Sequence, residues 1–291
     1  MSRTIPSRPT VVILGTPERE HVAAEVKRIR SSITESAEIL AVDLEFSFDF
    51  SSPEAKDVDL VIVVGGDGSI LRAARQMGDR PLPVLGVNCG RLGFLAAMSP
   101  EEFLDSWSGL LQGKHDVVDH LMLQAELRRG GEVLLSNLAL NEVAVLGGAP
   151  YQILEMDLYS DDVLATRYRC DGLIIATPIG STAHNLSAGG PILRRTLDAV
   201  VISPISPHTL TYRPLVDSAD AVLELQVIEC NQSTGLVVDG QMLAELQADD
   251  RIVVRRAPVA FPMVVGDGHN DYRALREKLG WGGSVPLRGR R

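Results

Sequence analysis

The stretch that decides the fold is Asp59-Leu60-Val61-Ile62-Val63-Val64-Gly65-Gly66-Asp67-Gly68-Ser69-Ile70-Leu71. It begins with a run of apolar, mostly β-branched residues, which predicts a buried parallel strand over 59–64. Glycines and one aspartate interrupt the run, and apolar residues then recur at helical spacing from Ile70 to Met77. The segment therefore predicts a strand, a tight turn and a helix over 69–77.

The turn has the composition of a phosphate site. Gly65, Gly66 and Gly68 let the backbone bend sharply and let a bulky anion approach its N–H groups, and the helix that begins near Ser69 adds a partial positive charge. Asp67 is the unusual member, because a carboxylate repels phosphate unless it holds a metal or takes a proton. The alternative is that Asp67 is a turn or N-cap residue, the commonest use of Asp at a helix start.

Composition limits the classes of function. The chain has 291 residues, 45% of them hydrophobic, which is enough for one large domain or two ordinary ones. Its net charge of −10 argues against nucleic-acid binding and against a polybasic membrane anchor. No apolar run has the length of a membrane span or a signal core. Three widely spaced cysteines fit neither a disulfide framework nor a zinc site, so we expect a cytoplasmic protein.

The first part of the chain alternates strands with helices. Strands are expected at 10–15, near 42–44, at 59–64 and at 83–87, and helices at about 17–33, 69–77 and 100–112. This alternation predicts a parallel sheet with helices on its faces. Since ligands of such sheets sit at the carboxyl ends of strands, the segments 65–68 and 88–93 should flank one crevice.

After His115 the pattern changes to short alternating runs with turn signals between them, which predicts antiparallel β structure. The expected strands are 120–128, 132–138, 141–146, 152–158, 163–168, 172–176, 199–203, 221–228, 235–238, 251–255 and 260–264. Asn270 and Asp271 are possible caps of a last helix over 272–279. We therefore predict an α/β domain over 1–117, completed by a C-terminal helix within 266–291, and a β-rich domain over 118–265.

A second chemical cluster lies at 170–192, where a buried strand gives way to small and hydroxyl-bearing residues. Such a run is either a polar loop with an ordinary helix cap or a surface that binds a flat or charged ligand; its length favours the latter. The pair Asn141-Glu142 is either a solvated strand end or a grip on a vicinal diol. Asp239-Gly240-Gln241 is first a hairpin turn signal, and a functional role there is secondary.

These motifs together resemble the NAD kinase family. The elements are Gly65-Gly66-Asp67-Gly68, Asn141-Glu142, the long run from Asp171 through Thr177-Pro178 and Gly180-Ser181-Thr182-Ala183 to Ser187-Ala188-Gly189-Gly190-Pro191, and the Asp239-Gly240-Gln241 turn. The similarity extends over about 10–280. The glycine–aspartate motif also occurs in lipid kinases and phosphofructokinases, whereas the run 171–191 distinguishes NAD kinases from those relatives.

The resemblance implies a phosphofructokinase-like α/β N-terminal domain, a β-rich C-terminal domain and an active site between them. It implies transfer of the γ-phosphoryl group of ATP to the 2′-hydroxyl of the adenosine ribose of NAD, with Mg²⁺ held mainly through ATP phosphates rather than by a protein metal site. A homodimer or homotetramer is also implied, with NAD and ATP as substrates and no nucleic-acid or membrane partner.

The resemblance also suggests roles for residues. Asp67 is the expected general base, and Gly65, Gly66 and Gly68 are expected to present N–H groups to phosphates. Arg72 either compensates phosphate charge or is a solvated helix residue. The remaining residues are expected to contact the dinucleotide: Phe94, Asn141, Glu142, Asp171, Thr182, Ala183, His184, Ser187, Asp239 and Gln241.

Four positions depart from the family pattern. Ser69 stands where Thr is usual, Ile179 where Thr or Ser is usual, His184 where Tyr is usual, and Cys170 where Gly is frequent. Ile179 removes a hydrogen-bonding group from the nucleotide loop, and His184 could alter nucleotide preference or pH response. These changes keep a non-catalytic NAD(P)-binding sensor as an alternative. A lipid kinase is the other alternative, although the sequence has no sign of membrane attachment.

Overall fold

The computed structural model describes residues 4–16, 20–90, 93–96, 98–149, 153–266 and 271–280. The chain divides into two compact units. Unit 1 comprises residues 1–77, 82–118 and 262–291, and unit 2 comprises 78–81 and 119–261. The domain limits predicted from the sequence stay a prediction, since compactness does not show that either unit folds alone.

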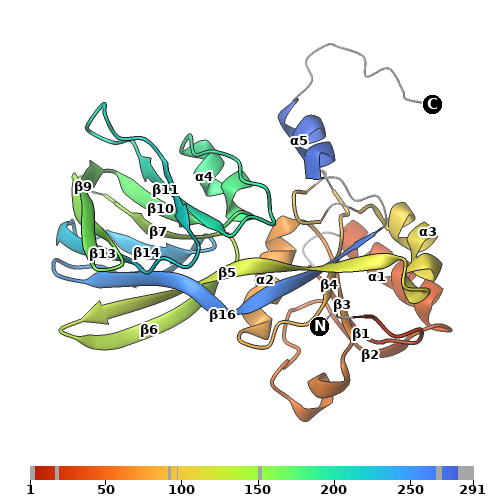
Figure 1. Ribbon diagram of the computed structural model, residues 1–291. Coiled ribbons are helices and arrows are strands. Elements are labelled where there is room, and N and C mark those ends of the chain that lie inside the picture. The colour runs from red at the N-terminus through yellow and green to blue at the C-terminus, as the bar shows by residue number, and fades with distance from the viewer. Residues whose placement is uncertain are drawn as a thin grey trace. The chain divides into compact units, whose positions relative to one another are not determined.

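Unit 1 contains a parallel sheet with helices (Figure 1). Its strands are β1 (Thr10–Gly15), β2 (Glu38–Asp43), β3 (Leu60–Val64) and β4 (Val84–Val87), and the order in the sheet is β2-β1-β3-β4. Its helices are α1 (Glu20–Ile33), the 3-10 turn η1 (Pro53–Asp57), α2 (Asp67–Met77), α3 (Pro100–Leu111) and α5 (Asp271–Leu279). All four strands run parallel, and Met263 of strand β16 (Arg251–Gly266) pairs with Val84 in parallel as well.

The core of unit 1 explains why these residues form this sheet. Every residue of β3 and β4 is buried, as expected for parallel strands covered on both faces. Val22, Val26 and Ile29 of α1 are also buried and belong to the same apolar cluster as the strands. This packing fixes the carboxyl ends of β1, β3 and β4, and those ends carry the candidate phosphate site.

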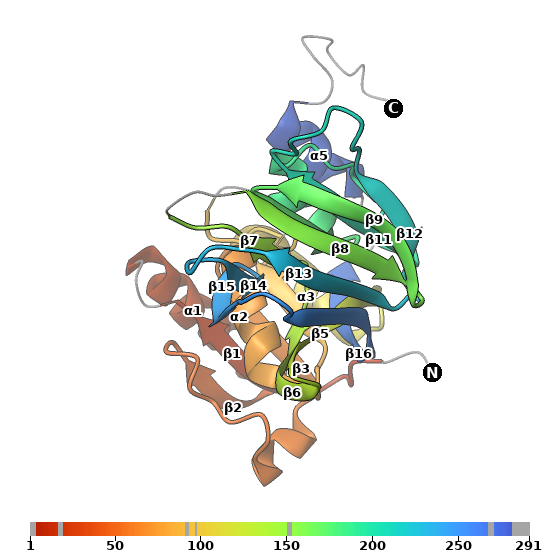
Figure 2. The ribbon, with the colours of Figure 1, turned by 90° about the vertical axis from the view of Figure 1, so that its left-hand side faces the viewer.

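Unit 2 contains two antiparallel layers. One sheet has the order β12-β11-β10-β7-β14-β15, whose strands are β12 (Leu215–Ser218), β11 (Ala199–Ile205), β10 (Gly172–Ala176), β7 (Glu142–Leu146), β14 (Gly235–Val238) and β15 (Gln241–Glu245). The other layer contains β9 (Val163–Cys170), β8 (Leu154–Ser160), β13 (Leu223–Glu229), β16 (Arg251–Gly266), β5 (His115–Arg129) and β6 (Glu132–Ala139). Figure 2 shows β8, β9 and β13 side by side, as their pairings require.

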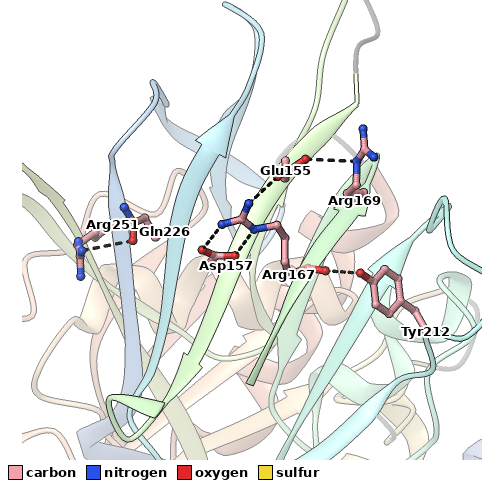
Figure 3. A network of polar contacts seen from close by, with 7 residues as sticks. All are labelled: Glu155, Asp157, Arg167, Arg169, Tyr212, Gln226 and Arg251. Carbon is pink, nitrogen blue, oxygen red and sulfur yellow. Dashed lines mark hydrogen bonds and ion pairs between the residues drawn. The ribbon is translucent and has the colours of Figure 1, made fainter. Parts of the chain in front are cut away.

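One apolar cluster fills the space between these two layers. It includes Val143 and Leu173 from one sheet and Met156, Leu225 and Ile252 from the other. The opposite face of the β8–β9–β13 layer is polar: Arg167 forms a bidentate pair with Asp157, at 2.6 and 2.8 Å (Figure 3). That pair lowers the pKa of Asp157. Alternation of apolar and charged residues along β8 therefore sets which face is buried.

The predicted fold class is confirmed, with an α/β part followed by a β-rich part. Three details differ. The strands predicted at 251–255 and 260–264 are one continuous strand. Pro258 lies between them; it lacks an N–H donor, but its φ angle is compatible with an extended strand, so it does not end the strand. Strand β12 was not predicted, since most of its residues are exposed and carry no burial pattern. Strand β15 was not predicted either, although the turn that precedes it was.

Some predictions concern residues outside the described ranges. Asn270, a predicted cap of the last helix, is one of these, as are the first residues of the helix predicted from 17 and the chain from Trp281 onward. Within the described ranges, no helix is both long enough and apolar enough to cross a membrane.

Candidate functional site

The predicted phosphate turn lies where β3 ends and α2 begins. A Cβ atom on Gly65 would come within 2.3 Å of the Ser69 hydroxyl oxygen, so only glycine allows this turn to close on the helix. The N–H of Gly65 donates to the Val87 carbonyl oxygen at 2.8 Å. Gly65 therefore supplies the bend and ties β3 to β4, and its N–H is not available to a phosphate. This corrects the expectation that all three glycines present N–H groups.

A pocket of about 590 Å³ opens at this turn. Its lining comes from the carboxyl ends of β1, β3 and β4 and from the first turns of α1 and α2: Thr16, His21, Val22, Gly65, Gly66, Gly68, Ser69, Asn88, Cys89 and Gly90. The segments 65–68 and 88–90 thus share one crevice, as the sequence predicted for the described part of 88–93. A Cβ added to Gly66 or Gly68 would meet no atom within 4 Å, so both glycines border open space.

Asp67 is held by a neighbouring loop. Its Oδ1 accepts the N–H groups of Leu95 and Ala96 at 2.9 and 3.0 Å, and its Oδ2 accepts the N–H of Phe94 at 2.8 Å. The carboxylate therefore binds the 94–96 backbone instead of capping its own helix. The alternative that Asp67 is an ordinary N-cap is wrong. A Cβ on Gly93 would lie 2.0 Å from Oδ1, so this grip also requires glycine at 93.

A cation from the C-terminal helix completes this neighbourhood. Lys278 of α5 places its Nζ 3.7 Å from Oδ2 of Asp67 and 4.2 Å from the centroid of the Phe94 ring. Both side chains of the ion pair keep 29% exposure. Phe94 was predicted to contact the dinucleotide, and the structure places its backbone and its ring beside Asp67.

Arg72 contacts the 45–46 segment, and its role toward phosphate stays a prediction. Its guanidinium donates to the Glu45 carbonyl oxygen at 2.6 Å and lies 4.5 Å from the centroid of the Phe46 ring. Arg72 is not among the residues that line the described pocket. These contacts join α2 to the 45–46 segment.

In unit 2, Asp239 organises the start of β7. Its carboxylate accepts the N–H groups of Leu140, Asn141 and Glu142 at 2.9, 2.7 and 3.1 Å. Asp239 and Gly240 have φ angles of 46° and 76°, and they connect β14 to β15 in register Val238↔Gln241. This is the two-residue hairpin that the sequence predicted, with the positive φ angles of a type I′ turn.

Glu142 has an unusual environment. Its side chain is buried, with 5% exposure of the residue, and its Oε2 atom has no hydrogen-bond partner among the described residues. Burial, together with the negative charge of Asp239, raises the pKa of Glu142 to about 7. Near neutral pH this carboxyl group can therefore accept or donate a hydrogen bond. The description of Glu142 as a solvated strand-end charge is wrong.

The loop after β10 is built by close backbone contacts to the Asn141 segment. Thr177 donates through its N–H to the Asn141 carbonyl oxygen at 2.8 Å and through its hydroxyl to the Leu140 carbonyl oxygen at 2.6 Å. A Cβ on Gly180 would lie 1.9 Å from the Asn141 carbonyl oxygen. Asn185 then joins the turn η2 (Gly180–Thr182), helix α4 (His184–Ser187) and strand β11, because its side chain contacts residues 181, 191 and 203.

Some of the other predicted residues of unit 2 lie in this loop, and two lie elsewhere. Thr182 donates its hydroxyl to the Ile179 carbonyl oxygen at 3.1 Å, Ala183 and His184 are half-buried, and Ser187 is exposed. Asp171 lies at the other end of β10, where one carboxylate oxygen is 3.4 Å from Nε2 of His208. Gln241 is exposed at the start of β15. Their roles in nucleotide binding stay predictions.

Two departures from the family pattern prove to be interior positions. Ile179 is 3% exposed, so its side chain packs inside and the substitution removes no donor from the loop surface. Cys170 is fully buried, and burial raises the pKa of its thiol to about 12. Neither side chain is therefore exposed.

The sequence did not single out several residues of these regions. Thr16 and His21 line the pocket although they lie about 50 residues before the glycine turn, and only the expected parallel order of the strands could have suggested them. Asn185 was read as part of a polar run rather than as its central hydrogen-bonding residue. Lys278 belongs to the predicted last helix, and no local pattern marks it.

In the described ranges, no group of three or more His, Cys, Asp or Glu residues could hold a metal ion.

Comparisons with known proteins agree with this architecture. Residues 17–115 match the ATP-NAD kinase N-terminal domain, and residues 140–265 match the ATP-NAD kinase C-terminal domain. An NAD kinase of Rhodopirellula baltica is 61% identical over 280 residues, which cover 96% of this chain and 89% of that protein. An NAD kinase of Cellvibrio japonicus is 44% identical over 228 residues, covering 78% of this chain and 76% of that protein.

Two solved structures have the same fold. An NAD kinase from Archaeoglobus fulgidus in complex with ATP matches with a TM-score of 0.73 and 29% identity, covering 93% of this chain and 99% of that one. Yeast NADH kinase complexed with NADH matches with a TM-score of 0.85, covering 97% and 91%. At 24% identity, the second likeness concerns the fold alone. The two domain matches and the 61% identity over nearly the whole chain show that it belongs to the ATP-NAD kinase family.

Proposed function

We propose that this chain transfers the γ-phosphoryl group of ATP to the 2′-hydroxyl of the adenosine ribose of NAD. In this reaction the 2′-oxygen forms a bond to the γ-phosphorus, the bond from that phosphorus to the β–γ bridging oxygen breaks, and the 2′-hydroxyl proton leaves. The products are NADP and ADP. Family membership supports the substrates, and the fixed carboxylate at the glycine turn supports the chemistry.

The geometry of Asp67 is the observation that carries the proposal. Three backbone N–H groups fix its orientation, while 29% of the side chain remains exposed. Oδ1 accepts two of these N–H groups and Oδ2 accepts one, so Oδ2 keeps a lone pair for an incoming hydroxyl. A base held in this way loses little freedom when the acceptor arrives, which is what positioning contributes to phosphoryl transfer.

The remaining roles follow from the same geometry. Gly66 and Gly68 border the pocket with open space in front of them, so phosphate oxygens can approach their backbone. Glu142, whose Oε2 has no hydrogen-bond partner in the described part of the chain, and the adjacent Asn141 are assigned to the ribose hydroxyls of NAD. We assign Asp171, Thr182, Ala183, His184 and Ser187 to the dinucleotide surface, with the exposed or half-buried positions described above.

Magnesium belongs to the proposal as an ion bound mainly through ATP phosphates, where it would neutralise phosphate charge. The hydroxyl of Ser69 lines the pocket and is an oxygen donor that such an ion accepts. We also propose a cytoplasmic location, and assembly into a homodimer or a homotetramer.

The test is an assay with the full chain, NAD, MgCl₂ and one phosphoryl donor at a time. The donors are ATP, another nucleoside triphosphate and polyphosphate, and the product is detected with an NADP-specific dehydrogenase. We expect NADP to form with ATP. Binding of NAD by calorimetry without NADP formation under any donor would establish a sensor in place of a kinase. Phosphorylation of diacylglycerol, measured in parallel, would instead establish a lipid kinase.

A further inference from the structure

The C-terminal helix α5 belongs to unit 1 and forms an ion pair with helix α3. Its residues Ala274 and Leu275 are buried. Arg273 donates to Glu102 of α3 at 2.9 Å and also pairs with Glu277 at 3.1 Å. The first of these pairs joins residues 171 positions apart. The Arg273–Glu102 pair therefore ties helix α5 to helix α3, and Lys278 lies one turn further along the same helix.

Lys278 lies over the catalytic neighbourhood that was described for Asp67. Its Nζ is 3.7 Å from Oδ2 of Asp67, the oxygen that accepts only one N–H group. The same ammonium group lies 4.2 Å from the centroid of the Phe94 ring, and the Phe94 N–H is the donor to Oδ2. One cation thus contacts both the carboxylate and the residue that orients it. Cation–π and charge contacts of this kind are attractive at partly exposed sites.

We propose that Lys278 is a positioning residue for phosphoryl transfer. Together with the Phe94 N–H, it holds Oδ2 of Asp67 so that the remaining lone pair is directed toward the acceptor hydroxyl, and it fixes the Phe94 ring through the cation–π contact. This inference rests on the proposed function, since it assigns to Lys278 the orientation of the proposed base. It is not required by the fold, because exposed ion pairs contribute little to stability.

The distribution of positively charged side chains around the site supports this assignment. Among the described residues that line the pocket, His21 is the one side chain able to carry positive charge, and none is Lys or Arg. Arg72, which follows the glycine turn, donates to the Glu45 carbonyl oxygen and lies over the Phe46 ring. Phosphoryl transfer brings several negative charges to Asp67, and an unscreened carboxylate would repel them. Lys278 offsets the carboxylate charge at the atom where repulsion would be greatest.

The experiment compares Lys278→Met, Lys278→Arg and Arg276→Met in the full chain. Arg276 is the matched control because it is an exposed cation of the same helix, so its loss changes the net charge by the same amount. For each variant, kcat and the KM values for NAD and ATP are measured with the NADP assay, and the thermal midpoint is measured without substrates. Lys278→Ala is also assayed with and without added ethylamine, which can replace the missing ammonium group.

We expect Lys278→Met to lower kcat about 10-fold to 100-fold, the range for a misplaced catalytic group. Its KM for NAD should change less than about twofold, because Lys278 is assigned to orientation of the base rather than to binding. Lys278→Arg should recover most of kcat, ethylamine should raise kcat of Lys278→Ala, and Arg276→Met should match the original chain. All thermal midpoints should agree.

Three outcomes would overturn the inference. The first is an unchanged kcat in Lys278→Met. The second is an equal loss in Arg276→Met, which would show a general charge effect. The third is a drop in thermal midpoint together with no rescue by arginine or ethylamine, which would show a purely structural role. If the original chain makes no NADP, the proposed function fails and the inference fails with it, whereas the first three outcomes leave the proposed function intact.

Discussion

Asp67 in unit 1 and Asp239 in unit 2 form the same kind of hydrogen bonds with backbone N–H groups, but they lie in very different surroundings. Each carboxylate accepts three consecutive backbone N–H groups, those of residues 94–96 and 140–142 respectively. Asp67 keeps 29% side-chain exposure and faces a lysine. Asp239 is 7% exposed, and its charge acts on a second buried carboxyl group, that of Glu142.

The difference shows that a backbone grip does not by itself define a carboxylate's role. Around Asp67, exposure and a nearby cation leave an oxygen that a substrate can reach. Around Asp239, burial makes the same three hydrogen bonds an anchor for strand β7. The carboxyl group there that can contact a ligand is that of Glu142, whose Oε2 has no hydrogen-bond partner among the residues that the structure describes. Four substitutions test this division between a reactive carboxylate and an anchoring one.

Asp67→Asn should lower kcat by roughly 10²-fold or more, the usual loss when a general base is removed. The amide oxygen can still accept the N–H groups of Leu95 and Ala96, whereas the NH2 group would face the Phe94 N–H, so the thermal midpoint should fall modestly and NAD binding should be largely retained. Steady-state kinetics, calorimetry with NAD and thermal unfolding measure the three quantities. Near-normal turnover would remove Asp67 from the role of base and would make the two aspartates alike.

Gly93→Ala should damage the same carboxylate indirectly. The added Cβ would lie 2.0 Å from Oδ1 of Asp67, so the carboxylate or the loop must move. We expect kcat to fall about 10-fold to 100-fold because the base is displaced. Gly109→Ala in α3 is the control, since its Cβ would meet no atom closer than 3.7 Å. Equal kcat values for both variants would show that the 94–96 grip is not needed for turnover.

Asp239→Ala should act on stability more than on chemistry. It leaves three N–H groups at the start of β7 without their acceptor in a buried place. We expect a loss of roughly 2–3 kcal/mol in the free energy of unfolding, the cost of unsatisfied buried donors. Chemical denaturation measures it, with Asp67→Ala as the comparison at the exposed site. If Asp67→Ala destabilises the chain as much, the distinction between anchor and base is wrong.

The sequence predicted the main architecture because its signals were strong. Buried β-branched runs and glycine-rich turns located β3, the glycine turn and β10, and the Asp239-Gly240 dipeptide predicted its hairpin. It could not locate contacts between distant segments. Nothing near Asp67 indicates that residues 94–96 supply its hydrogen bonds, and nothing near Lys278 indicates that α5 brings it there.

Burial decided the other differences between prediction and structure. Glu142 was expected either as a solvated charge or as a ligand group, and the structure shows a buried carboxyl group beside a second one. Ile179 was expected at the loop surface and packs inside. Arg72 was left between two roles, and its partners at 45–46 lie 26 or more positions away in the chain. Each outcome depends on tertiary packing, which local patterns do not encode.

Glu142→Gln should change stability in the opposite direction to Asp239→Ala, and by an amount that depends on pH. Because burial and Asp239 raise the pKa of Glu142 to about 7 in the folded chain, the neutral acid is the form that folding favours. Its stabilising contribution is complete below the ordinary pKa of Glu, about 4.3, and is lost as the pH rises through 7. Glutamine is neutral throughout, so the variant should match the original chain near pH 4 and exceed it at pH 8.

The expected gain at pH 8 is at most about 3 kcal/mol, since each unit of pKa shift corresponds to about 1.4 kcal/mol and part of the shift relaxes through solvent. Denaturant unfolding at the two pH values measures it. Glu132→Gln, at an exposed strand end, is the control and should show no such gap. A gain that is equal at both pH values would mean that Asp239 and burial do not suppress ionisation of Glu142. Unit 2 would then hold two ordinary charged carboxylates, and the contrast with Asp67 would rest on exposure alone.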